Sequence, residues 1–228
     1  MIYVSVIMVV CMSLTCWRLT RSLRRSQLKV QLLKARCHEL ESAHTQLVNH
    51  AYFDHLTGLA NRSLLEDRFR LAIERTKRSQ IPFALVMIDL NDFKGINDAL
   101  GHLAGDALLV EVSRRLVAAV RASDTVARFG GDEFVLIVES MAHGMEFGPL
   151  AFKLMDALSA PIALDESVGK AKTSGGRMIH PSASIGFSVY PRDGETMAEL
   201  LNVADRAMYD CKASGMMPLF QDNVPTLA

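Results

Sequence analysis

The stretch Arg128-Phe-Gly-Gly-Asp-Glu-Phe-Val135 decides the fold. Two short apolar runs, Val126 to Phe129 and Phe134 to Val138, flank the paired glycines and the two acidic residues. Paired glycines between such runs are typical of a β-hairpin turn, because glycine readily adopts the positive φ angles that tight turns need. The sequence therefore predicts a hairpin with Asp132 and Glu133 held near its tip.

A third acidic residue, Asp89, directly follows the apolar run Phe83 to Ile88, which has the length of a buried strand. Carboxylates from the ends of neighbouring strands can share a hard cation, and Mg²⁺ usually takes one or two of them while water and phosphate oxygens complete its shell. Each of these residues, taken alone, is also explained as an ordinary turn or loop residue. Together they predict a site for a divalent cation.

The remaining periodicity predicts an α+β fold of the ferredoxin-like, palm-type class, with a central antiparallel sheet backed by helices on one face. Residues 165 to 179 contain three glycines and several basic residues and predict a loop, with a phosphate-binding loop as the alternative. The other predicted elements are helices over Leu64 to Lys77, Ala107 to Val120, Gly144 to Leu158 and Met197 to Ser214, and a strand over Ser182 to Tyr190.

Composition limits the function classes. The 228 residues are 50% hydrophobic and carry 25 basic and 25 acidic side chains, which excludes a disordered, collagen-like or wholly coiled-coil chain. Residues 51–228 carry 18 basic against 23 acidic residues, so we expect no DNA or RNA partner. The cysteines lack the spacing of a zinc site or a disulfide framework; they are Cys11, Cys16, Cys37 and Cys211.

The N-terminal residues 1–17 carry no charge, end in Trp17 and precede four arginines between positions 18 and 25. Seventeen residues is about the minimum length for spanning a bilayer. An arginine cluster after an apolar run indicates a cytoplasmic flank. We therefore expect a transmembrane anchor, with the protein in the inner membrane and its main domain in the cytoplasm. A buried core helix or part of a longer sensor is the alternative.

Residues 18–50 predict a helical linker with a short coiled-coil seam, which would pair two copies in a parallel homodimer. Apolar or small residues recur at heptad spacing, with interruptions at Ser26 and His44, so a single amphipathic helix explains the segment nearly as well. The seam residues are Leu23, Val30, Cys37, His44 and Ala51 at one position and Leu33, Leu40 and Leu47 at the other.

Beyond residue 50 the chain resembles the GGDEF family of diguanylate cyclases. Five further blocks agree with the family in order and spacing: Asp54-His-Leu-Thr-Gly-Leu-Ala-Asn-Arg62, Asp89-Leu-Asn-Asp-Phe-Lys-Gly-Ile-Asn-Asp98, Gly101-His-Leu-Ala-Gly-Asp106, Ser184-Ile-Gly186 and Ala204-Asp-Arg-Ala-Met-Tyr209. The resemblance implies a catalytic domain over residues 51–217 and a C-terminal tail over 218–228.

The resemblance implies that a dimer of the protein condenses two GTP molecules into cyclic di-GMP with release of two pyrophosphates. Asp89 and Asp132, helped by the carbonyl of Leu90, would bind Mg²⁺, or Mn²⁺ in its place, and Asp132 is the favoured proton acceptor. Glu133 would contact metal or hydroxyl, or only support the fold. Lys94 would stabilise charge on the transferring phosphate.

Asn97, His102 and Asp106 match the family positions that hold guanine and ribose. A carboxylate there accepts from guanine N1–H and N2–H₂, which adenine does not present, so the resemblance implies selection of GTP over ATP. Lys212 would contact the triphosphate. Met216 stands where the family usually has arginine, and we expect GTP affinity to fall by about ten- to a hundredfold.

Arg121 and Asp124 match a family site at which the product binds and inhibits, so the resemblance implies feedback inhibition by cyclic di-GMP. A surface ion pair is the simpler explanation of these two residues. Two other functions stay open: a catalytically weakened domain that acts as a cyclic di-GMP receptor, and a structural membrane-tethered domain without a nucleotide.

Overall fold

The computed structural model describes residues 12, 17–18, 21, 29, 31–43, 46–139, 147–164 and 177–214. The chain divides into two compact units, Met1–Asn49 and His50–Ala228. In the first unit, residues 31–43 and 46–49, which lie within the predicted linker 18–50, are helical. The side chains of Leu33, Leu40 and Leu47, three of the predicted seam residues, are exposed on this helix.

The predicted inner-membrane location is wrong. Among the described residues, the chain contains no helix with both the length and the apolar character needed to cross a bilayer. Of the segment 1–17 that was expected to be a transmembrane anchor, Met12 and Trp17 belong to the described part and the others lie outside it.

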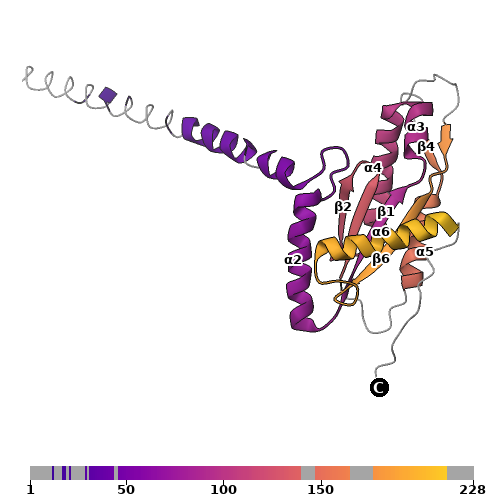
Figure 1. The fold of residues 1–228 in the computed structure, drawn as a ribbon. Helices are drawn as coiled ribbons and strands as arrows, with labels where there is room; N and C mark the ends of the chain where they lie inside the picture. The colour runs from indigo at the N-terminus through magenta and orange to yellow at the C-terminus, as the bar shows by residue number, and fades with distance from the viewer. Residues whose placement is uncertain are drawn as a thin grey trace, which may run out of the picture. The chain divides into compact units, whose positions relative to one another are not determined.

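The second unit is an α+β domain, as predicted (Figure 1). Its four-stranded sheet has the order β2-β3-β1-β6, and every neighbouring pair is antiparallel. The elements, in chain order, are α2 (Arg62–Ser79), β1 (Phe83–Leu90), α3 (Phe93–Leu100), α4 (His102–Ala119), β2 (Thr125–Gly130), β3 (Glu133–Val138), α5 (Phe147–Ser159), β4 (Ile162–Leu164), β5 (Arg177–Ile179), β6 (Ala183–Tyr190) and α6 (Met197–Ser214).

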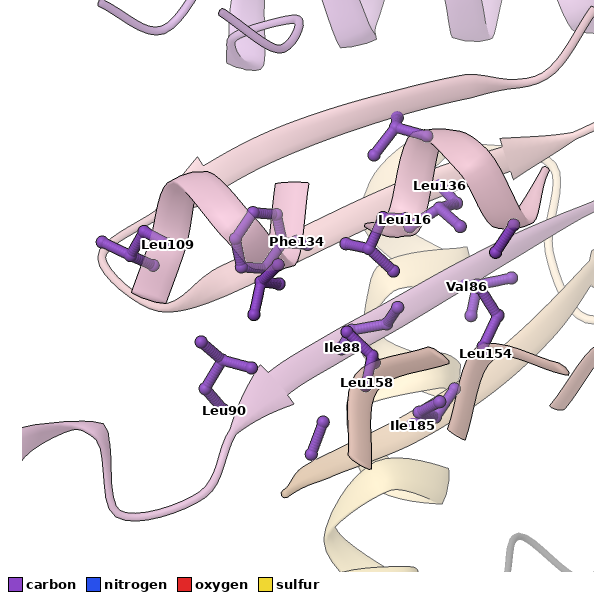
Figure 2. Close-up of a cluster of buried hydrophobic side chains, with 14 of the residues drawn as sticks. Val86, Ile88, Leu90, Leu109, Leu116, Phe134, Leu136, Leu154, Leu158 and Ile185 are labelled. Carbon is purple, nitrogen blue, oxygen red and sulfur yellow. The ribbon is translucent and has the colours of Figure 1, made fainter. Parts of the chain in front are cut away.

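Helices cover both faces of this sheet, so the expectation of helices on one face is wrong. Val86, Ile88 and Leu90 of β1 pack with residues of α4 and α5 in one core, part of which Figure 2 shows. Phe83 and Leu85 belong to a second core with residues of α2 and α6. A strand that is apolar at every position must be covered on both faces, which the unbroken run of β1 already indicates.

Gly186 lets α6 lie directly on β6. A Cβ atom at this position would lie 1.9 Å from the carbonyl oxygen of Ala204 and 2.7 Å from the backbone nitrogen of Met208. Any side chain would therefore meet the backbone of α6, which cannot move aside as a flexible side chain can. This close approach fixes the path of α6 over the sheet, and with it the position of Lys212 near the helix end.

Two short elements depart from the sequence-based expectation. β5 lies inside the predicted loop 165–179 and pairs with β4, because Ile179 is buried in the core. Residues 165–176 of that loop lie outside the described part of the chain, as do residues 144–146 of the predicted helix before α5. The eight-residue helix α3 was missed, since no residue in it is fully buried.

We predict that Gly186→Ala lowers the free energy of unfolding by about 2 kcal/mol or more, because overpacking against a rigid backbone is costly. The measurement is urea denaturation of the two proteins. Gly148→Ala in α5 is the matched control, because nothing lies within 4 Å of an added Cβ there. Equal stability of wild type and Gly186→Ala would contradict the close docking of α6.

Candidate active site

Three acidic residues meet at one edge of the sheet, as the sequence predicts. Asp89 near the end of β1 is paired in register with Glu133 at the start of β3. Asp132 lies in the turn between β2 and β3, and its carbonyl oxygen accepts a hydrogen bond of 3.3 Å from the backbone nitrogen of Leu90. Gly131 in this turn has a φ of +53°, a conformation in which any other residue would be strained.

Lys212 joins this edge from α6. Its Nζ atom lies 2.9 Å from Oδ1 of Asp89, although the two residues are 123 positions apart in the sequence. The lysine side chain is 51% exposed and Asp89 is 19% exposed, so the ammonium group reaches a largely buried carboxylate from the solvent side. The predicted triphosphate ligand and a predicted metal ligand are therefore in direct contact.

Negative charge accumulates around Glu133. Burial raises the pKa of Glu133, and the neighbouring carboxylates of Asp89, Asp132 and Asp205 raise it further. Asp205 comes from α6 and is absent from the predicted site, although it lies within the block Ala204 to Tyr209. Asp89 could be predicted because it follows an apolar strand. Asp205 lies within a helix and has no such signal in the sequence.

These oxygen donors fit a hard cation. The described residues hold no cluster of three or more His, Cys, Asp or Glu side chains that would bind a metal unaided. Two carboxylates with one backbone carbonyl suit Mg²⁺, which prefers to keep several positions for water and substrate phosphates. Asp89, Asp132 and the Leu90 carbonyl meet that requirement by their chemistry.

The three residues expected to hold guanine and ribose gather where α3 meets α4. Asn97 belongs to α3, and its carbonyl oxygen accepts a 2.8 Å hydrogen bond from Gly101, which separates the two helices. His102 and Asp106 lie in the first turns of α4, four positions apart and so on one side of the helix. Lys94 is exposed in the first turn of α3.

Arg121 and Asp124 lie at the other end of β2, about 17 Å from the turn at a rise of about 3.3 Å per residue. The Asp124 carboxylate is held by backbone groups. Its Oδ2 accepts from the backbone nitrogen of Arg121 at 2.9 Å, and its Oδ1 accepts from that of Glu139 at 3.1 Å. The pair is therefore separate from the acidic edge.

A partly buried ion pair between Arg128 and Asp54 supports the turn. Arg128 donates from Nε and Nη2 to the carbonyl oxygen of Gly131 at 2.9 and 2.8 Å. Its Nη1 contacts both carboxylate oxygens of Asp54, at 3.2 and 3.3 Å. Thr57 donates to the same carboxylate from its backbone nitrogen and its hydroxyl group. The sequence gave neither Asp54 nor Arg128 a role, although both lie in the blocks that carry the resemblance.

Comparison with known families decides the relationship. The family model described as "Diguanylate cyclase, GGDEF domain" matches residues 51–218. The chain belongs to this GGDEF family.

Among curated relatives, the chain is 43% identical over 176 residues to the bifunctional diguanylate cyclase/cyclic di-GMP phosphodiesterase MucR of Pseudomonas aeruginosa, covering 77% of this chain and 24% of MucR. It is 36% identical over 190 residues to the diguanylate cyclase TpbB of the same species, covering 82% of this chain and 42% of TpbB. The chain thus spans less than half the length of either relative.

Solved structures of GGDEF domains show the same fold. The GGDEF domain of TpbB superposes with a TM-score of 0.65 at 37% identity and covers 73% of this chain and 91% of that one. The coiled coil and GGDEF domain of DgcB from Caulobacter crescentus, solved in complex with c-di-GMP, gives a TM-score of 0.67 at 25% identity and covers 83% of this chain and 95% of that one.

The ion pair beneath the GGDEF turn has an electrostatic signature. Burial alone would raise the pKa of Asp54, but the hydrogen bonds from Thr57 and Arg128 outweigh burial and hold the pKa below its usual value of 3.8. Ionised Asp54 therefore stabilises the fold. A lowered folded-state pKa means that this contribution is present above the unfolded-state value and is lost as the pH falls through the folded-state value.

We predict that Asp54→Asn lowers the free energy of unfolding by about 2 kcal/mol at pH 7, because charged hydrogen bonds to Arg128 and Thr57 are lost. The difference should start to shrink as the pH falls below 3.8, the usual pKa of the unfolded state, and should vanish once the pH has fallen through the lower pKa of the folded state. Urea denaturation of wild type and variant at pH 7 and at a series of pH values below 3.8 measures this difference in stability. Asp67→Asn, which removes an exposed ion pair with Arg70, is the control and should change stability by less than about 0.5 kcal/mol.

Proposed function

We propose that the chain is a Mg²⁺-dependent diguanylate cyclase, which condenses two GTP molecules into cyclic di-GMP and two pyrophosphates. The observation that carries this proposal is the meeting of Asp89, Asp132 and Glu133 at one sheet edge, with Lys212 in contact with Asp89. The membership of the GGDEF family and the named activity of the relative TpbB support it.

Asp89 and Asp132 would hold Mg²⁺ together with the Leu90 carbonyl, and Mn²⁺ can replace it as another hard cation. When bound, the cation lowers the pKa of the attacking ribose 3′-hydroxyl and neutralises phosphate charge. Asp132 accepts the hydroxyl proton. Glu133 keeps the site strongly negative, which favours cation binding over the metal-free protein.

Lys94 and Lys212 supply positive charge to the triphosphate. Lys94 is exposed at the start of α3 and has no acidic partner among the described side chains that would neutralise it. Lys212 is paired with Asp89 and must exchange that carboxylate for phosphate oxygens when substrate binds. Because the pair is half exposed on the lysine side, the exchange costs little.

GTP is selected at the α3–α4 junction. Asp106 accepts hydrogen bonds from guanine N1–H and N2–H₂, while Asn97 and His102 contact other polar atoms of the nucleoside. Adenine would leave the Asp106 carboxylate without donors, and an unmade hydrogen bond to a desolvated charge is expensive. This chemistry assigns the base specificity to residues of two adjacent helices.

A homodimer would bring two such sites together, since each domain binds one GTP and the product contains two. Exposed Leu33, Leu40 and Leu47 of the linker 18–50 offer the apolar surface for pairing. The relative DgcB was solved with a coiled coil attached to its GGDEF domain. Residues 51–217 would form the catalytic domain and 218–228 a tail.

Arg121 and Asp124 would bind cyclic di-GMP and reduce activity as product accumulates. The backbone bonds that fix Asp124 leave its second lone pairs for a guanine edge, and the Arg121 guanidinium can stack on the base. The alternative is a chain whose GTP binding is weakened by Met216, a residue outside the described part. Such a chain would still bind cyclic di-GMP at Arg121 and Asp124 and would act as a receptor.

We predict that Asp132→Asn reduces the rate of pyrophosphate release from GTP at least a thousandfold, because one substitution removes a metal ligand and the proton acceptor. Asp67→Asn on α2 is the control and should keep wild-type activity. Circular dichroism establishes that both variants are folded. Turnover of Asp132→Asn within tenfold of wild type would show that the metal is held elsewhere.

A second prediction concerns regulation. Arg121→Ala should raise the cyclic di-GMP concentration needed for half-inhibition by at least tenfold, since the variant loses the stacking and charge of the guanidinium. Initial rates of GTP consumption are measured over a series of added cyclic di-GMP concentrations, with Arg114→Ala as an exposed arginine control on α4. Superimposable inhibition curves for wild type and Arg121→Ala would remove the product site from these residues.

A further inference from the structure

Gly105 lies in contact with the side chain of Asn97. Gly105 is buried in the first turns of α4, and Asn97 belongs to the neighbouring helix α3. A Cβ atom built on Gly105 would lie 2.1 Å from Oδ1 and 2.9 Å from Cγ of Asn97, and 3.2 Å from Cζ of Phe93. The first two distances are shorter than real non-bonded contacts, so a side chain here and the observed Asn97 conformation exclude each other.

A glycine inside a helix needs a physical reason. Glycine is among the poorest helix formers and alanine is the best, so α4 itself would be stabilised by alanine at this position. Gly105 lies within α4 and does not have a positive φ angle. In the described chain the glycines that do are Gly58, Gly101 and Gly131. An unusual backbone conformation therefore does not explain the glycine at position 105. The close approach of Asn97 is therefore the local feature that requires a missing side chain.

Nothing else within the described structure fixes the Asn97 carboxamide by hydrogen bonding. Its backbone carbonyl accepts from Gly101, but no side-chain hydrogen bond of Asn97 is formed with a described residue. The carboxamide is half-buried and rests against the surface that Gly105 provides. Its polar atoms have no hydrogen-bond partner among the described residues and stay available to a ligand.

We propose that Gly105 is a positioning residue for guanine recognition: its missing side chain lets the Asn97 carboxamide lie against α4, beside Asp106. The inference rests on the proposed function, which assigns Asn97 and Asp106 to the nucleoside. Because Asp106 follows Gly105 directly on α4, the contact sets how far the amide of one helix lies from the carboxylate of the other. Two groups that bind one rigid purine must keep a fixed separation.

An alanine at position 105 would push the Asn97 carboxamide away from α4. Hydrogen bonds weaken steeply when distance and angle are lost, so a shift of about 1 Å removes the Asn97 contact to nucleotide. The loss should match that of removing the carboxamide altogether. We therefore expect Gly105→Ala and Asn97→Ala to weaken nucleotide binding to a similar degree, each by about tenfold.

The test is a double-mutant cycle with Gly105→Ala, Asn97→Ala and the double variant of the full chain. The probe is the GTP analogue with a methylene group between its α- and β-phosphates, which binds with Mg²⁺ and cannot lose pyrophosphate. Dissociation constants come from isothermal titration calorimetry. We expect the double variant to bind within twofold of Asn97→Ala, because the glycine acts only through the asparagine.

Unfolding temperatures give a readout that does not depend on nucleotide. Gly105→Ala should be more favourable for the unfolding temperature in the Asn97→Ala background than in the presence of Asn97, because the alanine no longer displaces a carboxamide there while its better helix propensity remains. Gly148→Ala in α5 is the matched control, since an added Cβ there meets nothing within 4 Å. It should leave analogue binding unchanged.

Two results would overturn the inference alone: wild-type affinity of Gly105→Ala for the analogue, or losses that multiply in the double variant. Either would leave the proposed function standing, provided that the wild-type chain binds the analogue. Absence of binding by the wild-type chain would contradict the proposed function itself, and the inference with it.

Discussion

The central strand β1 is buried on both faces, and this constraint positions the acidic residues of the site. Its register with β3 and β6 places Asp89 opposite Glu133 on one side and Ser184 on the other. A slip of one residue would exchange the two faces of β1 and destroy both cores, so the register is strongly specified. The first polar side chain after six buried residues therefore emerges at one defined point of the sheet edge.

The acidic edge is electrostatically unfavourable, and the ion pair of Lys212 with Asp89 offsets part of the repulsion. Lys212 approaches Asp89 from the solvent side, while Arg128 holds the turn from the protein side and is itself neutralised by Asp54. The two arrangements differ in rigidity, because the Arg128 and Asp54 side chains are 14% and 16% exposed while Lys212 is 51% exposed. Arg128 therefore suits permanent support of the turn, and Lys212 suits exchange between partners.

The local sequence pattern predicted the strands that carry the acidic residues of the site. The glycine pair predicted the hairpin, and the apolar run before Asp89 predicted β1. The proximity of Asp89 to the acidic turn was then expected because these strands were expected to lie in one sheet. Contacts that depend on tertiary packing were missed. Arg128 and Asp54 are 74 residues apart, and Asp205 reaches Glu133 only because α6 crosses the sheet at Gly186.

Two expectations failed for identifiable reasons. Helices were expected on one face of the sheet only. The side chains of β1 are apolar on both faces of the strand, so each face must be covered by a helical layer. The membrane location was inferred from hydrophobicity and an arginine flank, and the described helices do not supply a span of the needed length and apolarity. Conversely, α3 has no fully buried residue, so hydrophobic periodicity carried little signal for it although it presents Lys94 and Asn97.

The stoichiometry of the reaction tests the proposed cyclase activity most directly. The purified full chain is incubated with GTP and Mg²⁺, and nucleotides and pyrophosphate are quantified by mass spectrometry and ³¹P nuclear magnetic resonance. We expect two GTP molecules to disappear for each cyclic di-GMP and each pair of pyrophosphates formed, with no consumption of ATP. Unchanged GTP in a folded sample that still binds cyclic di-GMP would contradict the proposed activity and identify the chain as a receptor.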